Sequence, residues 1–418
     1  MTRTWPGLTI PSMAQTSTKA AALQVLRRLR KAGFQALLAG GCVRDMLLGR
    51  RSSDYDVATD ARPDQVRRLF RHVLLIGAKF GVAMVMIDSQ KVEVTTFRSD
   101  LDYADGRRPE GVIFTTPRQD ALRRDFTING MFYDPQAREI IDYVGGQKDL
   151  RRGVVRTIGS PDERFGEDYL RMLRAVRFAV RLGFVLDPAT ARAVRKLAPR
   201  IVEISGERIL DELGKMLVRD SAASALRLLH KLNLARAIVS DLFAQGDSPW
   251  QAAVARTEAL PGRRDLTLAL GALLCGLDEK AIANVTRRWG GSNDIRQAAC
   301  WFSRNLRLWD KAEDIPLAEL KRLMAGENFV RLRAIWRAEE KRLTGRQVHA
   351  RRLTRRIGTI APSQVAPPPL VTGEDLKAMG LREGPQIGLI LRRLYNAQLD
   401  ERLTSREQAL TEVRNIIG

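Results

Sequence analysis

A glycine pair followed by two closely spaced aspartates is the part of this chain best suited to chemistry. Gly40 and Gly41 end a short apolar run, and Arg44 comes three residues later. Asp54 and Asp56 follow, separated by one residue. Glycines lack Cβ and let backbone N–H groups approach a phosphate closely, and a helix that begins beside them adds free donors. The pattern predicts a site for a nucleoside triphosphate.

The two aspartates are predicted to hold magnesium. Alternate side chains of a strand point to one side, so Asp54 and Asp56 should project together while Val57 points inward. Carboxylate oxygens suit Mg²⁺ that is shared with substrate phosphates. Two such ions about 3.5–4 Å apart can activate an attacking hydroxyl and stabilise a leaving pyrophosphate. An isolated Asp-X-Asp is more typical of a solvated turn, but the glycine pair and the flanking apolar strands favour the catalytic interpretation.

Two further stretches carry candidate residues. Glu93 lies in an alternating strand and can supply a third, catalytic carboxylate near the metals, although a surface position is an equally good interpretation. Arg124 is suited to clamp a triphosphate. Asp125 and Asn129 can hydrogen-bond ribose hydroxyls and so distinguish a ribonucleotide from its deoxy analogue. The alternative for this stretch is a helix cap with solvated arginines.

Residues 167–178 predict a helix with one packing face and one polar face. The polar side chains lie about one turn apart and are Asp168, Arg171, Arg174 and Arg177. A carboxylate accepts from an exocyclic amino group, and a neighbouring guanidinium donates to the adjacent ring nitrogen. Cytosine and adenine both present that edge, whereas uracil and guanine do not. Asp168 and Arg171 are therefore predicted to select CTP and ATP; the alternative is a solvated, salt-bridged helix face.

Taken in order, these motifs resemble those of the class II CCA-adding tRNA nucleotidyltransferases and the bacterial poly(A) polymerases. The resemblance covers residues 33–215 and includes Asp142 before Gly145 and Gly146. It implies a template-independent RNA polymerase that adds or repairs the 3′-terminal CCA of tRNA from CTP and ATP, with Mg²⁺ as cofactor and release of pyrophosphate. It also implies contacts of the tRNA 3′ end and of its acceptor and elbow backbone with the protein.

The resemblance assigns roles to individual residues of this chain. Gly40, Gly41 and Arg44 contact the triphosphate, and Arg124 grips the incoming nucleotide. Arg174 and Arg177 lie near the base-reading pair. One departure from the family pattern is Gly130, where an alanine is usual after the asparagine; we expect it to affect packing and leave the chemistry undisturbed.

The fold class that follows is α+β. The resemblance implies an N-terminal head with the polymerase-β-like nucleotidyltransferase fold, a mixed sheet with helices, and then an all-helical neck, body and tail. We expect the head over residues 1–150, the base-recognising neck over 151–225, the body over 226–365 and the tRNA-binding tail over 366–418. The residue pattern agrees with this organisation. Strand-like runs occur at 36–39, 55–58, 82–87 and 92–97, and strand signals almost vanish after about 155. Prolines at 362 and 367–369 mark a linker.

Composition points to an anionic partner. The 418 residues suggest two to four domains, and 70 Lys and Arg against 48 Asp and Glu give a net charge of +22. Such a charge favours nucleic acid, although a generally basic proteome is the alternative. The cluster at residues 351–356 is expected to contact tRNA backbone, or else to be a solvated helix face.

Cysteine usage and apolar runs suggest the compartment. Three cysteines without paired spacing fit a reducing compartment, and we expect a cytoplasmic protein. The longest apolar stretch, residues 266–277, is shorter than the roughly 18 residues of a membrane span, so no membrane association is expected. The first 44 residues contain no acid, as in a transit peptide, but an apolar stripe over 22–29 is more simply an amphipathic helix. The oligomeric state stays open.

Members of the family differ in what they add. The segment from Ser99 to Pro117 is long, which favours complete CCA addition over addition of CC alone. An A-adding tRNA nucleotidyltransferase or a poly(A) polymerase shares the same motifs and remains an alternative. A basic RNA-binding protein with an inactive head is the alternative from another class; the presence of both Asp54 and Asp56 argues against it. No tandem of histidine and aspartate is present, so we expect no phosphohydrolase activity.

Overall fold

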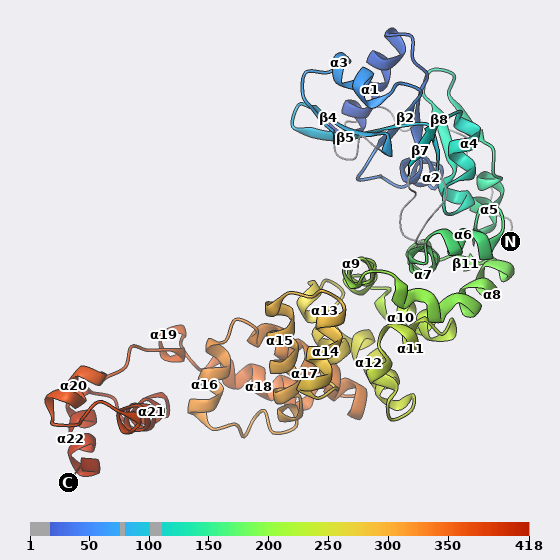
Figure 1. The fold of residues 1–418 in the computed structure, drawn as a ribbon. Helices are drawn as coiled ribbons and strands as arrows, with labels where there is room; N and C mark the ends of the chain where they lie inside the picture. Colours follow the sequence, from blue (N-terminus) through green and yellow to red (C-terminus); the bar gives the residue numbers. More distant parts are fainter. Residues whose placement is uncertain (1–16, 76–79, 101–110, 418) are drawn as a thin grey trace. The chain divides into compact units, whose positions relative to one another are not determined.

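The computed structural model describes residues 17–75, 80–100 and 111–417 of the chain (Figure 1). It divides into two compact units. The first unit comprises Met1–Met216 and Ser224–Ser240, and the second comprises Leu217–Ala223 and Asp241–Gly418. All residues predicted to do chemistry lie in the first unit. The finer division into head, neck, body and tail stays a prediction.

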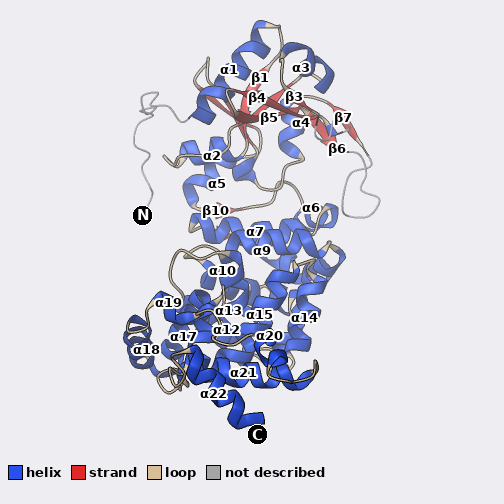
Figure 2. Cartoon of the chain, turned by 90° about the vertical axis from the view of Figure 1, so that its left-hand side faces the viewer, coloured by secondary structure: helices blue, strands red, loops and turns tan. Residues whose placement is uncertain are grey.

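A seven-stranded mixed sheet forms the head of the first unit. Its order is β3-β4-β5-β2-β1-β8-β9, and every pairing is antiparallel except that of β2 with β5. The strands are β1 (Ala36–Ala39), β2 (Asp56–Thr59), β3 (Val73–Leu74), β4 (Val82–Ile87), β5 (Gln90–Thr96), β8 (Met131–Asp134) and β9 (Glu139–Asp142). Figure 2 shows these strands gathered together. The predicted mixed sheet is confirmed; β3, β8 and β9 are not among the strands that periodicity indicated.

Helices cover the sheet and join its strands. The N-terminal helix α1 (Ser17–Lys31) packs on β1, β2 and β5 through Ala22, Val25, Leu26 and Leu29, none more than 2% exposed. The amphipathic helix predicted there is therefore confirmed. The other head helices are α2 (Gly41–Leu47), α3 (Pro63–Leu69), α4 (Pro117–Leu122) and the 3₁₀ turn η2 (Thr127–Asn129). Strands β6 (Arg98–Asp100) and β7 (Val112–Phe114) pair with each other, and residues 101–110 of the long segment between Ser99 and Pro117 lie outside the described residues.

The part of the first unit after the sheet is helical except for one small strand pair. Its helices are α5 (Gly146–Arg152), α6 (Pro161–Glu167), α7 (Leu170–Leu182), α8 (Pro188–Leu197), α9 (Gly206–Leu217), α10 (Ala222–Lys231) and α11 (Leu234–Ile238). Gly153 and Gly183 end α5 and α7 in the left-handed conformation, with φ of 67° and 72°. The extended residues after them pair in parallel as β10 (Val154–Val155) and β11 (Val185–Leu186). The prediction of a purely helical neck therefore missed a two-residue pair.

The helix predicted over residues 167–178 is interrupted at its start. Asp168 has an extended backbone, with φ of −158°, and lies between α6 and α7. Its carboxylate accepts the N–H of Leu170, 3.1 Å away, at the beginning of α7. The prediction that Asp168 belongs to one helix with Arg171 is wrong, because this short hydrogen bond to the backbone competes with a continuous helix.

The second unit is helical throughout its described residues. Its helices are α12 (Ser248–Ala259), α13 (Leu266–Leu274), α14 (Glu279–Arg288), α15 (Asn293–Asn305), α16 (Leu317–Ala325), α17 (Phe329–Thr344), α18 (Val348–Gly358), α19 (Pro362–Val365), α20 (Gly373–Ala378), α21 (Pro385–Leu399) and α22 (Arg406–Ile417). One core lies around Phe302, Leu332 and Trp336, and a separate core lies around Leu376 and Val413. Among the described helices, none is long and apolar enough to cross a membrane.

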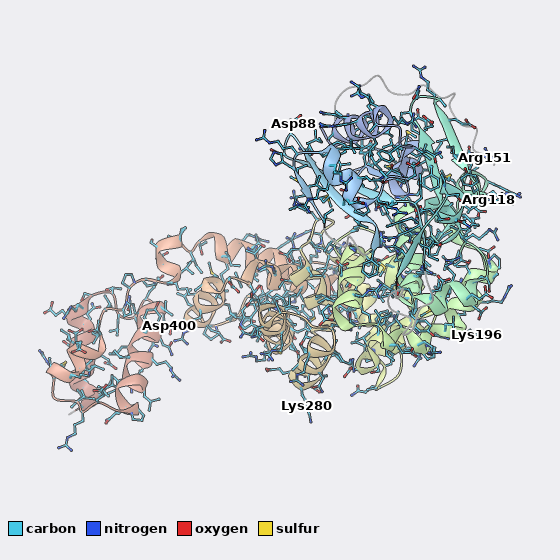
Figure 3. All side chains as sticks on the ribbon, turned by 45° about the horizontal axis from the view of Figure 1, so that its top comes forward. Asp88, Arg118, Arg151, Lys196, Lys280 and Asp400 are labelled. Atoms are coloured by element: carbon cyan, nitrogen blue, oxygen red, sulfur yellow. The ribbon has the colours of Figure 1, made fainter. Side chains whose placement is uncertain are left out.

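A reciprocal pair of helix caps joins α16 to the end of α21. Lys321 of α16 is 2% exposed, and its ammonium donates to the carbonyl oxygen of Leu399 at 2.8 Å and to the Glu401 carboxylate at 2.9 Å. In return, the carboxylate of Asp400, a residue labelled in Figure 3, accepts the N–H of Ala318 at 2.8 Å, at the start of α16.

Replacement of Lys321 tests this joint. Lys321→Met keeps the aliphatic stem and removes the donor to Leu399 and Glu401, so we expect a loss of about 1–3 kcal/mol in the free energy of unfolding. Urea denaturation measures it. The neighbouring exposed residue supplies the control, because Arg322→Met should change the midpoint little. Equal midpoints for the two variants would contradict the stabilising role of the joint.

Candidate nucleotide and metal site

The glycine turn lies directly after β1 and is closely covered by an arginine. Gly40 has φ of 71° and ψ of −128°, a conformation that favours glycine. A Cβ on Gly40 would lie 2.9 Å from Nη1 of Arg124. The guanidinium of Arg124 is held there by the buried carboxylate of Asp120, at 2.9 and 3.2 Å, and lies over the ring of Phe132. The structure therefore brings Gly40, Gly41 and Arg124 together, as the sequence predicted.

A chain of buried hydrogen bonds connects α2 with α7. Arg44, 3% exposed, donates from Nη1 to Oδ1 of Asn129 at 2.6 Å. The amide of Asn129 donates to Oδ1 of Asp125 at 3.0 Å, and Arg174 donates to Oδ2 of Asp125 at 2.8 Å. Burial raises the pKa of Asp125, but the charge of Arg174 and the hydrogen bond from Asn129 outweigh it and lower this pKa to about 2. Asp125 is therefore charged at neutral pH and links the two helices.

These hydrogen bonds occupy the groups that were predicted to contact ribose. Asp125 and Asn129 use their polar atoms on Arg174, Arg44 and each other, and Asp125 also accepts the N–H of Phe126 at 2.8 Å. Both side chains lie in the candidate site, and in this structure they position the arginines around them. Their role in recognising ribose stays a prediction.

The loop after β9 supports the same region. The carboxylate of Asp142 accepts three backbone N–H groups, those of Val144, Gly146 and Gln147. A Cβ on Gly146 would lie 2.2 Å from the carbonyl oxygen of Thr127, so only glycine allows this close approach. The loop therefore packs directly on the turn that carries Asn129.

Three carboxylates act on one another at the edge of β2. Asp54 precedes the strand and is exposed, Asp56 begins it, and Val57 is buried as predicted. The parallel register sets Val57 opposite Val94, which places Glu93 beside Asp56 on the neighbouring strand. Burial and then the charge of Glu93 raise the pKa of Asp56 to about 6, with Asp54 adding to the effect and Arg124 opposing it.

The carboxylate set fits a divalent cation by its chemistry. Asp54, Asp56 and Glu93 offer hard oxygen ligands, the kind that Mg²⁺ prefers, and their mutual repulsion would be relieved by a cation. Within the residues that the structure describes, no three acidic, histidine or cysteine side chains already enclose a metal position. The assignment of Asp54 and Asp56 as metal ligands and of Glu93 as a third catalytic carboxylate stays a prediction.

The predicted base-reading residues are each held by a neighbour. Asp168 accepts from Nη2 of Arg208 at 2.7 Å. Arg171 is 9% exposed, and it donates to the carboxylate of Glu167 and, at 2.8 Å, to the carbonyl oxygen of Arg164. Arg171 therefore does not lie on an open helix face. Sequence reasoning missed Glu167 and Arg208 as partners, because no pattern links Arg208 to a carboxylate forty residues before it.

Arg174 and Arg177 belong to a cluster of guanidinium groups around Phe178. The guanidinium carbons of Arg44, Arg174 and Arg177 lie 5.2, 5.5 and 4.3 Å from the centre of its ring. The carboxylate of Glu212, 1% exposed, accepts from Arg177 at 2.6 Å. Burial lowers the pKa of Arg177, although the charge of Glu212 opposes the change. Each of the three arginines has a carboxylate partner, Asp45 for Arg44, Asp125 for Arg174 and Glu212 for Arg177, so the cluster is balanced in charge.

Gly130 is closely packed. A Cβ at this position would lie 2.7 Å from Cγ2 of Val144 and 3.0 Å from Cδ1 of Ile158. The alanine that the family resemblance implies here would therefore require these two side chains to shift. The structure thus gives Gly130 a role in local packing.

Comparisons with known proteins identify relatives along the whole chain. The model for the "Poly A polymerase head domain" matches residues 36–156, and that for the "Probable RNA and SrmB- binding site of polymerase A" matches residues 183–245. The CCA-adding enzyme of Geobacillus thermodenitrificans is 39% identical over 314 residues, which cover 73% of this chain and 76% of that enzyme. Poly(A) polymerase I of Escherichia coli O157:H7 is 41% identical over 245 residues, 55% of this chain and 53% of the polymerase. This chain thus aligns with about half the length of the polymerase.

A solved structure extends the likeness to three dimensions. The crystal structure of the Bacillus stearothermophilus CCA-adding enzyme in complex with CTP matches with a TM-score of 0.79 and 29% identity. The match covers 96% of this chain and 99% of that enzyme. The α+β head and the helical remainder are therefore shared over almost the entire length.

Replacement of Asp125 tests the hydrogen-bond chain. Asp125→Asn removes the charge that holds Arg174, so we expect the free energy of unfolding at neutral pH to fall by about 2–4 kcal/mol. Because the folded-state pKa is lowered, the carboxylate stabilises the protein above about pH 4, and this stabilisation is lost as the pH falls towards 2. Denaturant titrations at several pH values should show a weaker acid dependence in the variant.

A surface pair supplies the control for this prediction. Asp162 pairs with Lys196, which is labelled in Figure 3, and both side chains are at least half exposed. Asp162→Asn should change stability little, since exposed ion pairs contribute little. If Asp125→Asn behaves like Asp162→Asn, the buried link is not what holds α7 in place.

Proposed function

Because this chain belongs to the family of CCA-adding enzymes and bacterial poly(A) polymerases, we propose that it adds or repairs the 3′-terminal CCA of tRNA from CTP and ATP. The chain is a nucleotidyltransferase, as predicted. One observation carries the choice of CCA addition: the likeness to CCA-adding enzymes spans 76% of one relative and 99% of a solved one, whereas the likeness to poly(A) polymerase I spans 53%. Three buried cysteines without disulfides fit the reducing cytoplasm as its compartment.

Asp54 and Asp56, with Glu93 beside them, would hold the metal ions of the reaction. Two Mg²⁺ ions supply activation of the terminal hydroxyl of the RNA and stabilisation of the leaving pyrophosphate. The triphosphate binds at Gly40 and Gly41, where the backbone is open to close approach. Arg124, already fixed by Asp120, donates to its phosphate oxygens, since a guanidinium pairs with phosphate bidentately.

Asp168 and Arg171 select the incoming base. The Asp168 carboxylate accepts from the exocyclic amino group of cytosine or adenine, and Arg171 donates to the adjacent ring nitrogen. Glu167 and Arg208 orient the pair before the nucleotide enters, as their hydrogen bonds indicate. UTP and GTP present the opposite pattern and leave buried groups without partners, which can reduce their use by several powers of ten.

The second candidate function is poly(A) addition. The 41% identity to poly(A) polymerase I favours it over any unrelated activity. Extension of tRNAs that end in the discriminator base, in C or in CC, with each nucleotide alone, separates the two. Addition of C to the first two substrates and of a single A to the third supports CCA repair; addition of many A residues to all three supports a poly(A) polymerase. A basic RNA-binding protein with an inactive head would add nothing.

Replacement of a metal carboxylate tests the reaction. Asp56→Asn keeps the shape of the side chain and removes its charge, so we expect incorporation of CMP into tRNA to fall by at least about a hundredfold. Binding of tRNA should persist, because it depends on the dispersed basic surface. The matched control is Asp64→Asn, in which an exposed aspartate of α3 changes in the same way. Normal turnover by Asp56→Asn would contradict the metal assignment.

Replacement of Asp168 tests base selection. In Asp168→Ala the acceptor for the amino group is lost, so we expect the ratio of kcat/KM for CTP to that for UTP to fall by about tenfold or more. The same exchange at the exposed Asp211, which pairs with Lys215, serves as control and should leave this ratio unchanged. Selectivity that survives in Asp168→Ala would refute the role of the carboxylate in reading the base.

A further inference from the structure

The side chain of Arg164 connects the end of α4 with α6. Arg164 lies in α6, and its side chain is 15% exposed. The guanidinium donates from Nη2 to the carbonyl oxygen of Leu122 at 2.8 Å and from Nη1 to that of Arg123 at 3.1 Å. Its Nε donates to the carbonyl oxygen of Ile158 at 3.1 Å. One side chain thus holds backbone groups from two other segments of the first unit.

The carbonyl groups of Leu122 and Arg123 stand at the C-terminal end of α4. The helix ends at Leu122, and Arg123 is its C-cap. The last carbonyl groups of a helix have no donor within the helix and carry partial negative charge, which a cation stabilises. Arg164 supplies this cation from more than forty residues further along the chain. The backbone that leads into Arg124 is therefore held by Arg164, while Asp120 holds the Arg124 side chain.

The same guanidinium reaches Arg171 through a shared carboxylate. Nη1 of Arg164 donates to Oε2 of Glu167 at 3.0 Å, and this oxygen also accepts from Arg171 of α7. In addition, Arg171 donates to the carbonyl oxygen of Arg164 at 2.8 Å. Arg171 is therefore connected to Arg164 twice, once through Glu167 and once through the backbone. The helices α4, α6 and α7 are labelled in Figure 1.

The shape of the guanidinium makes these contacts depend on one another. Its N–H groups lie in one plane and point in fixed directions, so the position of one acceptor constrains the positions of the others. Ile158 extends the connection, because its N–H donates to the carbonyl oxygen of Asp125 at 3.2 Å. The residues on both sides of Arg124 are thus joined to the side chain that holds Glu167.

We propose that Arg164 is a positioning residue that sets Arg124 and Arg171 relative to each other. A nucleotide whose triphosphate is held by Arg124 then presents its base to Arg171 at hydrogen-bonding distance. The inference rests on the proposed function and adds a determinant of base selectivity that contacts neither phosphate nor base. Hydrogen bonds weaken steeply with poor distance and angle, so a small displacement between the two arginines reduces discrimination between bases.

Removal of the guanidinium tests the proposal. Arg164→Met keeps the aliphatic stem and removes the donors to Leu122, Arg123, Ile158 and Glu167. The Kd values of CTP and UTP are measured by isothermal titration calorimetry without RNA, so that no turnover takes place. We expect the ratio of Kd for UTP to Kd for CTP to fall about fivefold or more, because Arg171 no longer meets the base in the correct position.

The control is an arginine that makes contacts of the same kind with β1 and β8. The side chain of Arg30 is 18% exposed, donates to the carbonyl oxygen of Ala36 at 2.7 and 3.0 Å, and pairs with Asp134 at 2.9 Å. Arg30→Met should lower the midpoint of urea denaturation, as Arg164→Met does, and leave the ratio of the two Kd values unchanged. An equal fall of this ratio in both variants, or no fall in Arg164→Met, would overturn the proposal.

Two further variants decide the question if Arg164→Met does not fold. In Arg164→Lys a single ammonium cannot reach all the acceptors, so we expect the ratio to fall about threefold. A wild-type ratio in the folded lysine variant would overturn the proposal. The double variant Arg164→Lys, Glu167→Gln should lose less than the product of the two single losses, because both residues act on the position of Arg171. Losses that multiply fully would contradict the connection through Glu167.

Failure of the proposed function would show separately. The calorimetric comparison needs no RNA, whereas incorporation of CMP and AMP into tRNA by the wild-type protein reports on CCA addition. A wild-type protein that adds no nucleotide, yet prefers CTP to UTP and loses this preference in Arg164→Met, would refute the function and support the positioning role.

Discussion

The buried link from Arg44 through Asn129 and Asp125 to Arg174 is the interaction on which the candidate site depends. It joins the helix after the glycine turn to α7, which carries the arginine proposed to read the base, across residues far apart in the chain. A charged group inside a protein is costly unless it is paired and hydrogen-bonded, and here each member supplies a partner to the next. Because each member of the link has a partner, the glycine turn proposed to hold the phosphates and the helix proposed to select the base are connected by buried polar contacts.

Charge is arranged differently in the two units. In the first unit, three carboxylates gather at the edge of β2, where burial and the charge of Glu93 raise the pKa of Asp56, and three guanidiniums gather around the ring of Phe178. In the second unit, acids and bases balance everywhere except on α17 and α18.

Much of the fold was predictable from local pattern. The apolar runs at 36–39 and 82–87 coincide with β1 and β4, and the apolar stripe of α1 is buried as expected. Strands β8 and β9 were missed because they are defined by pairing with β1 and with each other, which periodicity does not report. The break at Asp168 was missed because a side-chain hydrogen bond to the backbone, invisible in the pattern, ends one helix and begins the next.

The sequence predicted which residues lie in the candidate site, but it did not predict which hydrogen-bond partners hold them. The motifs named Asp125, Asp168 and Arg171, but the partners that hold them lie between four and forty-nine residues away and are chosen by the tertiary fold.

The most direct test of the account is a crystal structure with Mn²⁺ and a non-hydrolysable CTP analogue. We predict anomalous scattering from metal bound between the carboxylates of Asp54 and Asp56, with the triphosphate against Gly40 and Gly41. Metal bound elsewhere, or a triphosphate remote from the glycine turn, would contradict it.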